Sequence, residues 1–143
     1  MISATDDCGY GWRMERILRV RGAEEAVIAA DDPGLMLGLT VFDTLRCYGG
    51  VPFRLDAHID RLEASAQAMG IELVDRDRVR EEILEVCRED WRVRYMVTAG
   101  GARVVDAAPL DLARVGAPIK AARIAWSPAP GLAGSVKHGS RAG

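Results

Sequence analysis

Arginines are the residues of this chain whose chemistry and spacing best suit the binding of a small anionic molecule. A guanidinium donates two parallel hydrogen bonds at once, which suits a phosphate or a carboxylate. Phe42 and Arg46 are four residues apart in the β-rich stretch Leu39–Tyr48, so in a strand they share one face. An apolar wall with an arginine reaching over it fits an amino acid that carries a side chain and a carboxylate. Taken by itself, Phe42 is better explained by core packing, and for Arg46 the spacing leaves open a solvent-facing position.

The cysteines give no sign of a metal centre or a disulfide framework. Cys8, Cys47 and Cys87 are an odd number, with no C-x-x-C spacing, and they form no cluster with His58 or His138. We therefore predict no metal site. Reduced, mostly buried thiols are expected, as in a cytoplasmic protein.

Composition fits one folded domain. The 143 residues are 49% hydrophobic and 28% charged, and 19 basic against 21 acidic residues give a net charge of −2. This near-neutral balance gives no reason to expect a nucleic acid or a membrane as partner. The first 12 residues lack the basic start and apolar run of a secretory signal, and no stretch approaches the ~20 apolar residues of a membrane span. We expect a cytoplasmic location.

Most of the expected elements are strands. Alternation and apolar runs predict strands over 16–21, 26–30, 39–48, 51–55, 92–99 and 121–126. Pro33 and Gly34 indicate a break after the second strand, and Gly49-Gly50 indicates a hairpin after the third. In the third strand, Val41, Asp43, Leu45 and Cys47 lie on the face opposite to Phe42 and Arg46.

Two helices follow the hairpin. Helical spacing of apolar residues predicts a helix over 56–69, with Asp56 as its N-cap and Gly70 at its end. A second helix is expected after Asp75. Residues 102–118 have a loop-like composition, with one helical turn around 111–115. This order predicts an α+β fold, with two helices packed on one face of a mostly antiparallel sheet.

Four blocks resemble, in order, the class IV (fold-type IV) pyridoxal-phosphate (PLP) enzymes. The blocks are Gly38–Tyr48, Pro52–Leu62, Arg94–Gly101 and Val136–Arg141. That family includes branched-chain aminotransferases, D-amino-acid aminotransferases and 4-amino-4-deoxychorismate lyases. Each block alone is a weak signal, but four in the family order are a strong one.

The resemblance assigns a role to individual residues. It implies that PLP is the cofactor, and that Lys137 forms the Schiff base with the cofactor aldehyde and moves the substrate α-proton. Arg61 is implied to bind the cofactor phosphate. Phe42, Arg46 and Arg94 match positions that line the substrate pocket. Taken by themselves, Lys137 and the three arginines also fit ordinary surface positions, with Arg61 paired to a neighbouring helix carboxylate.

The family pattern also predicts how the chain is organised. It implies a small N-terminal domain over 1–126, an interdomain linker over 127–134 and the start of a larger PLP-binding domain over 135–143. Two features of this larger domain, an acidic residue for the pyridine nitrogen and a phosphate cradle, would follow Lys137. The resemblance further implies a homodimer.

Three functions remain as hypotheses. The first is transfer of an amino group between an amino acid, branched-chain or otherwise apolar, and 2-oxoglutarate as the keto acid. The second is cleavage of 4-amino-4-deoxychorismate, and the third is a non-catalytic small domain. The triplet Arg46-Cys47-Tyr48 favours the branched-chain enzymes, whereas the pattern Lys137-x-x-Ser140-Arg141 favours the lyase and D-amino-acid branches. Leu37 departs from the aromatic residue that many of the aminotransferases have before the glycine of the first block.

Overall fold

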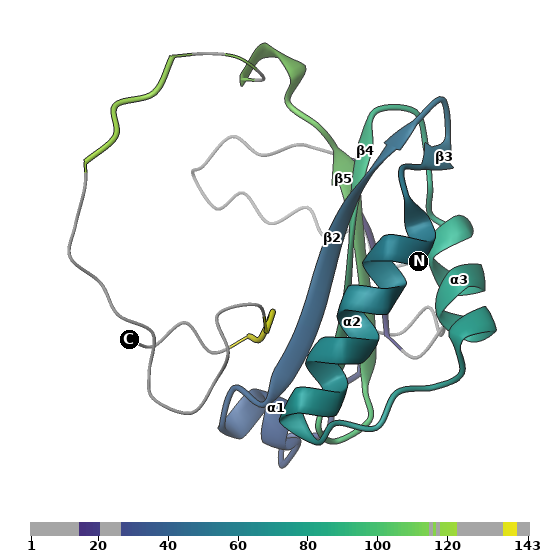
Figure 1. Ribbon diagram of the computed structural model, residues 1–143, viewed down its shortest axis with the longest axis vertical. Helices are drawn as coiled ribbons and strands as arrows, with labels where there is room; N and C mark the ends of the chain where they lie inside the picture. The colour runs from purple at the N-terminus through teal and green to yellow at the C-terminus, as the bar shows by residue number, and fades with distance from the viewer. Residues whose placement is uncertain (1–14, 21–26, 115, 117, 123–135, 140–143) are drawn as a thin grey trace.

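A five-stranded antiparallel sheet in the order β1-β5-β4-β2-β3 organises the chain (Figure 1). The computed structural model describes residues 15–20, 27–114, 116, 118–122 and 136–139. The strands are β1 (Ile17–Val20), β2 (Thr40–Tyr48), β3 (Val51–Pro52), β4 (Trp91–Thr98) and β5 (Arg103–Pro109). The helices are α1 (Pro33–Met36), α2 (Leu55–Met69), α3 (Arg76–Leu84) and the 3-10 turn η1 (Leu112–Arg114). Both long helices cover one face of the sheet, which confirms the α+β prediction.

The predicted alternation along β2 is confirmed. Val41, Leu45 and Cys47 point to the helices and are at most 4% exposed, because they join the main apolar core with residues of α2 and α3. This burial fixes the register of β2, since a shift by one residue would turn these side chains to the other face. Phe42 and Arg46 therefore share the sheet face that points away from the helices.

The two helices begin and end largely where the sequence predicts. Gly70 ends α2 in the left-handed conformation, and the Asp75 carboxylate accepts a hydrogen bond from the Arg78 amide at the start of α3. The expected N-cap at Asp56 is wrong. Arg54 occupies the cap position with a φ of 50° and no side-chain cap, while Asp56 lies in the first turn and pairs with arginines of α3.

Residues 103–109 correct the sequence analysis, because they form the strand β5 instead of a loop. The strand lies between β1 and β4 and pairs with both. Small side chains such as Ala107 and Ala108 gave it a weak strand signal. Ladder hydrogen bonds on both sides and nearly complete burial of Val105 and Ala107 outweigh that weak preference. The expected helical turn beyond it is confirmed as η1.

Three further strand predictions differ from the structure. Residues 27–30 form no strand, and the break at Pro33 begins the short helix α1, capped by Asp32. The return strand β3 stops at Pro52, because Arg54 turns left-handed to start α2. Residues 121 and 122 are not in a strand, whereas 123–126 and the predicted linker over 127–134 lie outside the described residues.

Candidate active site

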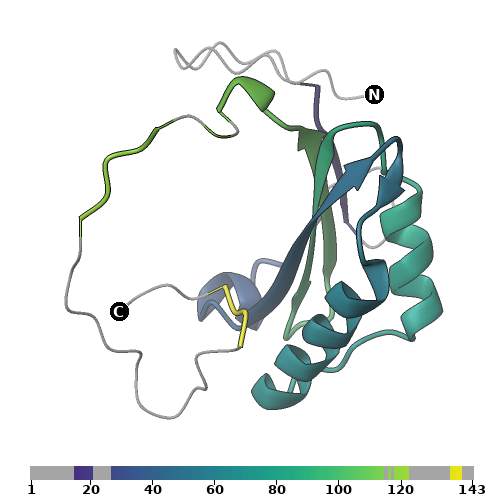
Figure 2. The same cartoon turned by 45° about the horizontal axis from the view of Figure 1, so that its top comes forward.

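A short distant segment pairs with the open edge of β2 and brings Lys137 to the sheet. His138 forms an antiparallel bridge with Val41, the Phe42 amide donates to the Lys137 carbonyl at 3.1 Å, and the Gly139 amide donates to the Thr40 carbonyl at 2.7 Å. Figure 2 shows this segment in yellow, beside α1 and the end of β2 that adjoins α1. From the helix side, the Ser65 hydroxyl of α2 accepts a hydrogen bond from the Lys137 amide at 3.2 Å. The backbone of Lys137 is thus held by both β2 and α2.

Gly139 is required for this close approach. A Cβ at this position would lie 1.7 Å from the Thr40 Oγ1 atom, well inside van der Waals contact. Thr40 is itself 6% exposed and branched at Cβ, so it has little freedom to move aside. Glycine at 139 therefore lets the Lys137 segment lie against the strand.

The Asp43 carboxylate lies at the centre of a cluster of basic side chains between β2 and α2. Its carboxylate accepts from Arg61 Nε at 2.6 Å and from Arg61 Nη2 at 2.7 Å, which is a two-point contact. His58 Nδ1 lies 3.2 Å and Lys137 Nζ 3.4 Å from the same Oδ1 atom. Asp43 is 4% exposed, whereas the side chains of Arg61 and Lys137 are 44% and 38% exposed. A buried anion therefore lies beneath two partly exposed cations.

The electrostatics of the cluster favour the charged forms of Asp43 and Arg61 at neutral pH. Burial alone would raise the pKa of Asp43, but hydrogen bonds, above all from Arg61, and the charge of Lys137 outweigh it and hold that pKa below its ordinary value. The same hydrogen bond from Arg61 to Asp43 raises the pKa of Arg61. One carboxylate faces a guanidinium and an ammonium, so the cluster has a net positive charge. Such a cluster suits an anionic ligand.

Phe42 and Arg94 extend the site on the other face of the sheet. The Arg94 guanidinium carbon lies 4.0 Å from the centre of the Phe42 ring, and Lys137 Nζ lies 5.7 Å from it. Phe42 is 6% exposed. Because Lys137 lies at the strand edge, its amine is near both the Asp43 cluster and this aromatic ring.

Arg46 lies apart from the other predicted site residues. It is on the same sheet face as Phe42, but four strand positions, or about 13 Å, toward the hairpin. Its Nη2 donates to the Asp90 carboxylate at 2.7 Å, and its guanidinium stacks over the Tyr48 ring at 4.4 Å. The structure thus brings Lys137, Arg61, Phe42 and Arg94 together and leaves Arg46 at the other end of β2.

Three polar residues of this cluster were not predicted from the sequence. The sequence places Asp43 on one strand face with Val41, Leu45 and Cys47, and a carboxylate among apolar residues is the signal that could have indicated a paired charge. His58 and Ser65 are three residues before and four residues after Arg61 on α2. That spacing places all three on one helix face, which a search for polar stripes would have found.

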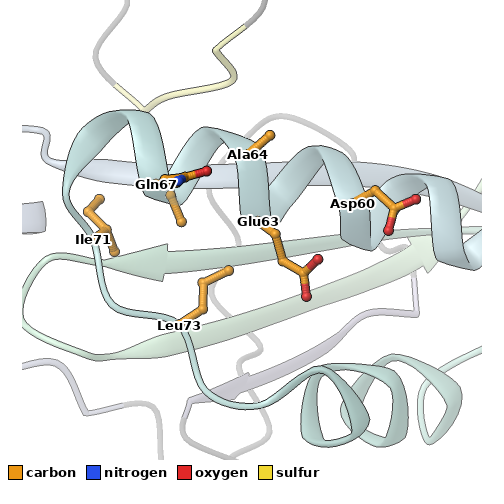
Figure 3. A pocket seen from close by; sticks show the side chains of 7 residues that line it. Asp60, Glu63, Ala64, Gln67, Ile71 and Leu73 are labelled. Carbon is orange, nitrogen blue, oxygen red and sulfur yellow. The ribbon is translucent and has the colours of Figure 1, made fainter.

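A shallow groove of about 500 Å³ lies elsewhere on α2 and contains none of the predicted site residues. It is lined by Asp60, Glu63, Ala64, Ala66, Gln67, Ile71 and Leu73 (Figure 3). Its two carboxylates already pair with Arg76 at 2.7 Å each. The groove therefore offers no free charge for a ligand.

Within the described residues, no group of three or more histidine, cysteine or acidic side chains could hold a metal ion. Among the same residues, no helix is long and apolar enough to cross a membrane.

Known proteins resemble part of this chain. Residues 40–138 match the family described as amino-transferase class IV. A putative branched-chain-amino-acid aminotransferase from Methanocaldococcus jannaschii is 35% identical over 82 residues, covering 54% of this chain and 28% of the relative. Aminodeoxychorismate lyase from Bacillus subtilis is 41% identical over 87 residues, covering 54% of this chain and 29% of the relative. The chain therefore spans less than a third of either relative.

A solved structure shares the fold. A hypothetical aminotransferase from Mycobacterium tuberculosis, in its PLP-bound form, superposes with a TM-score of 0.60 at 23% identity. The match covers 71% of this chain and 42% of the solved chain. At this identity the likeness shows the common fold.

Proposed function

Because this chain belongs to the class IV aminotransferase family, we propose that its residues serve a PLP-dependent aminotransferase. The donor substrate we propose is a branched-chain or other apolar amino acid, and the acceptor is 2-oxoglutarate. The observation that carries the proposal is the placement of Lys137 Nζ 3.4 Å from the carboxylate that also holds Arg61. One primary amine and one guanidinium thus contact the same buried carboxylate.

The donor set fits the cofactor that we propose. PLP carries a doubly charged phosphate and an aldehyde, so its site needs a guanidinium and a primary amine. Arg61 would hold the phosphate and Lys137 the aldehyde carbon, while the net positive charge of the cluster favours an anionic ligand. When bound, PLP supplies an electron sink that stabilises negative charge at the substrate α-carbon. The M. tuberculosis aminotransferase of similar fold was solved with PLP.

The surrounding residues have separate tasks in the proposed reaction. The Lys137 amine takes and returns the α-proton, because it is the basic group held at the strand edge beside Phe42. Phe42 offers an apolar wall to the substrate side chain. Arg94, stacked on that ring at 4.0 Å, is near enough to attract the substrate carboxylate. We propose that Arg46 serves the substrate from the far end of the same face.

The two lysines of the sequence, Lys120 and Lys137, make a direct test possible. The protein is incubated with PLP, reduced with borohydride, digested and analysed by mass spectrometry. We expect the modification at Lys137, its loss in Lys137→Ala and its retention in Lys120→Ala, since Lys120 is an exposed residue outside the cluster. Equal labelling of both lysines, or none, would contradict the proposal.

A lyase acting on 4-amino-4-deoxychorismate is the second candidate. It is favoured by the 41% identity to the B. subtilis lyase, which exceeds the 35% identity to the M. jannaschii aminotransferase. The two reactions differ in their need for a keto acid. A transaminase stops without an acceptor such as 2-oxoglutarate, whereas a lyase releases pyruvate without one. Assaying pyruvate release from 4-amino-4-deoxychorismate without added keto acid separates them.

A further inference from the structure

Arg61 is held in one orientation by its two-point contact with Asp43. Both hydrogen bonds come from Nε and Nη2, at 2.6 and 2.7 Å, so the Nη1 end of the guanidinium is directed away from the carboxylate. The guanidinium is planar and rigid, and fixing two of its nitrogens fixes the third. The side chain nevertheless remains 44% exposed. Arg61 is thus a partly exposed cation with a fixed direction.

Asp43 is well suited to act as the fixed support. It is 4% exposed and lies in β2, which is paired with β4 along its length. Its Oδ1 also accepts a hydrogen bond from the Thr44 amide at 2.6 Å, which limits rotation of the carboxylate. A carboxylate buried this deeply is retained only when it is well paired, and its partners here are the groups that line the site.

We propose that Asp43 is a positioning residue, which aims the Nη1 end of Arg61 at the phosphate of the cofactor. This inference rests on the proposed function, because it concerns the same phosphate. In this role Asp43 touches neither the cofactor nor the substrate. It acts through Arg61, which would otherwise sample several side-chain conformations and lose entropy when it binds the anion.

Removing the charge of Asp43 has a second effect on phosphate binding, opposite to the loss of positioning, so the direction of the measured change is informative. Asp43 is negative, so by charge alone its removal should strengthen the binding of a phosphate. Positioning predicts the opposite, a weaker preference for phosphate. The two explanations therefore differ in sign.

The experiment compares pyridoxal phosphate with pyridoxal, which has the same aldehyde and no phosphate. The half-saturating concentration for borohydride-fixed labelling of Lys137 is measured for each, and their ratio defines the phosphate preference. We expect Asp43→Asn to lower that preference about tenfold, the equivalent of one hydrogen bond to a charged group. Asp56→Asn is the control, because it removes the charge of a carboxylate that also pairs with arginines, Arg76 and Arg80, but lies outside the Asp43 cluster. It should leave the preference unchanged.

A double-mutant cycle separates positioning from a general disturbance of the fold. In an Arg61→Gln background, Asp43→Asn should have no further effect on the phosphate preference, because the residue through which it acts is gone. An equal loss in both backgrounds would overturn the inference. So would an unchanged or greater preference in Asp43→Asn alone.

Arg61→Lys tests the same inference without altering the buried strand. Lysine keeps the positive charge but cannot make the two-point contact. We expect it to lose most of the phosphate preference, and full retention would overturn the inference even if Asp43→Asn fails to fold. Wild-type protein without any phosphate preference would overturn both this inference and the proposed function. A wild-type preference that Asp43→Asn retains would overturn the positioning role alone.

Discussion

Replacing Gly139 with alanine should remove Lys137 from the sheet while leaving the rest of the fold intact. The added Cβ would lie 1.7 Å from Thr40 Oγ1 and 3.1 Å from Thr40 Cβ. Rotation of Thr40 gives little relief, because the residue is 6% exposed and its own Cβ, which rotation does not move, would lie 3.1 Å from the added Cβ. The segment must therefore move away from β2.

The displacement breaks three hydrogen bonds, and their loss sets its cost in free energy. They join the Phe42 amide to Lys137, the Gly139 amide to Thr40 and the Lys137 amide to Ser65, at 3.1, 2.7 and 3.2 Å. At about 1 kcal/mol each, their loss amounts to about 3 kcal/mol. This reduces the population of the docked segment by roughly a hundredfold. The main core contains no residue of the segment, so the midpoint of global unfolding should change little.

Amide hydrogen exchange measures this directly. The Phe42 amide should lose roughly a hundredfold in protection in Gly139→Ala, whereas amides of β4 keep theirs. The double variant Thr40→Ala/Gly139→Ala should restore most of the protection, because the collision with the oxygen is gone and the remaining Cβ–Cβ distance of 3.1 Å needs only a small shift. Thr40→Ala alone serves as its control. Unchanged protection at Phe42 in Gly139→Ala, or failure of the double variant to restore it, would refute the reasoning.

Two further predictions concern buried groups remote from Lys137. Glu82 is 3% exposed and accepts hydrogen bonds from Arg103 and Tyr95; burial raises its pKa, but these partners outweigh burial and hold the pKa below its ordinary value of 4.5. Glu82→Gln should lower the free energy of unfolding by about 3 kcal/mol at pH 7, measured by urea titration. The difference in this free energy between variant and wild type should shrink as the pH falls below about 4.5, because protonation of Glu82 removes the charge that the folded state stabilises. An equal difference at pH 3 and pH 7 would argue against an ionic role. Burial, with the neighbouring Cys47 thiol, raises the pKa of Cys87 from 9.0 to about 12, so at pH 8 its thiolate form is about a thousandfold less populated than that of an ordinary cysteine. Iodoacetamide should therefore alkylate Cys87 only after unfolding. Rapid labelling of Cys87 in the folded Cys8→Ser variant would contradict this prediction.

The sequence predicts the elements of this fold wherever the local pattern is strong. The alternation of Val41, Leu45 and Cys47 identified β2, and the cap at Asp75 identified the start of α3, because each signal lies within a few residues. The strand β5 was missed for the opposite reason. Ala107 and its neighbours have weak strand preferences, and pairing with β1 and β4 decides their conformation.

The sequence predicted individual residues of the candidate site, but not the contacts between them. Family resemblance pointed to Lys137 and Arg61, yet the Asp43 carboxylate that contacts both was identified only as one of four residues on a strand face. The ion pair between Asp43 and Lys137 joins residues 94 positions apart, a distance over which no local pattern carries information. Arg94 meets Phe42 because Thr44 pairs with Arg94 in the register of β2 and β4, which sequence spacing alone does not define.

The pairing of His138 with Val41 has a consequence for synthesis of the chain. These two residues are 97 positions apart, so at about 5–20 residues per second β2 is made roughly 5–20 s before its partner. During that interval the backbone groups of Thr40 and Phe42 on this edge have no strand to pair with. An open strand edge is a template for pairing with other chains. Newly made molecules therefore expose a template for pairing with other chains at the same edge that later holds the lysine.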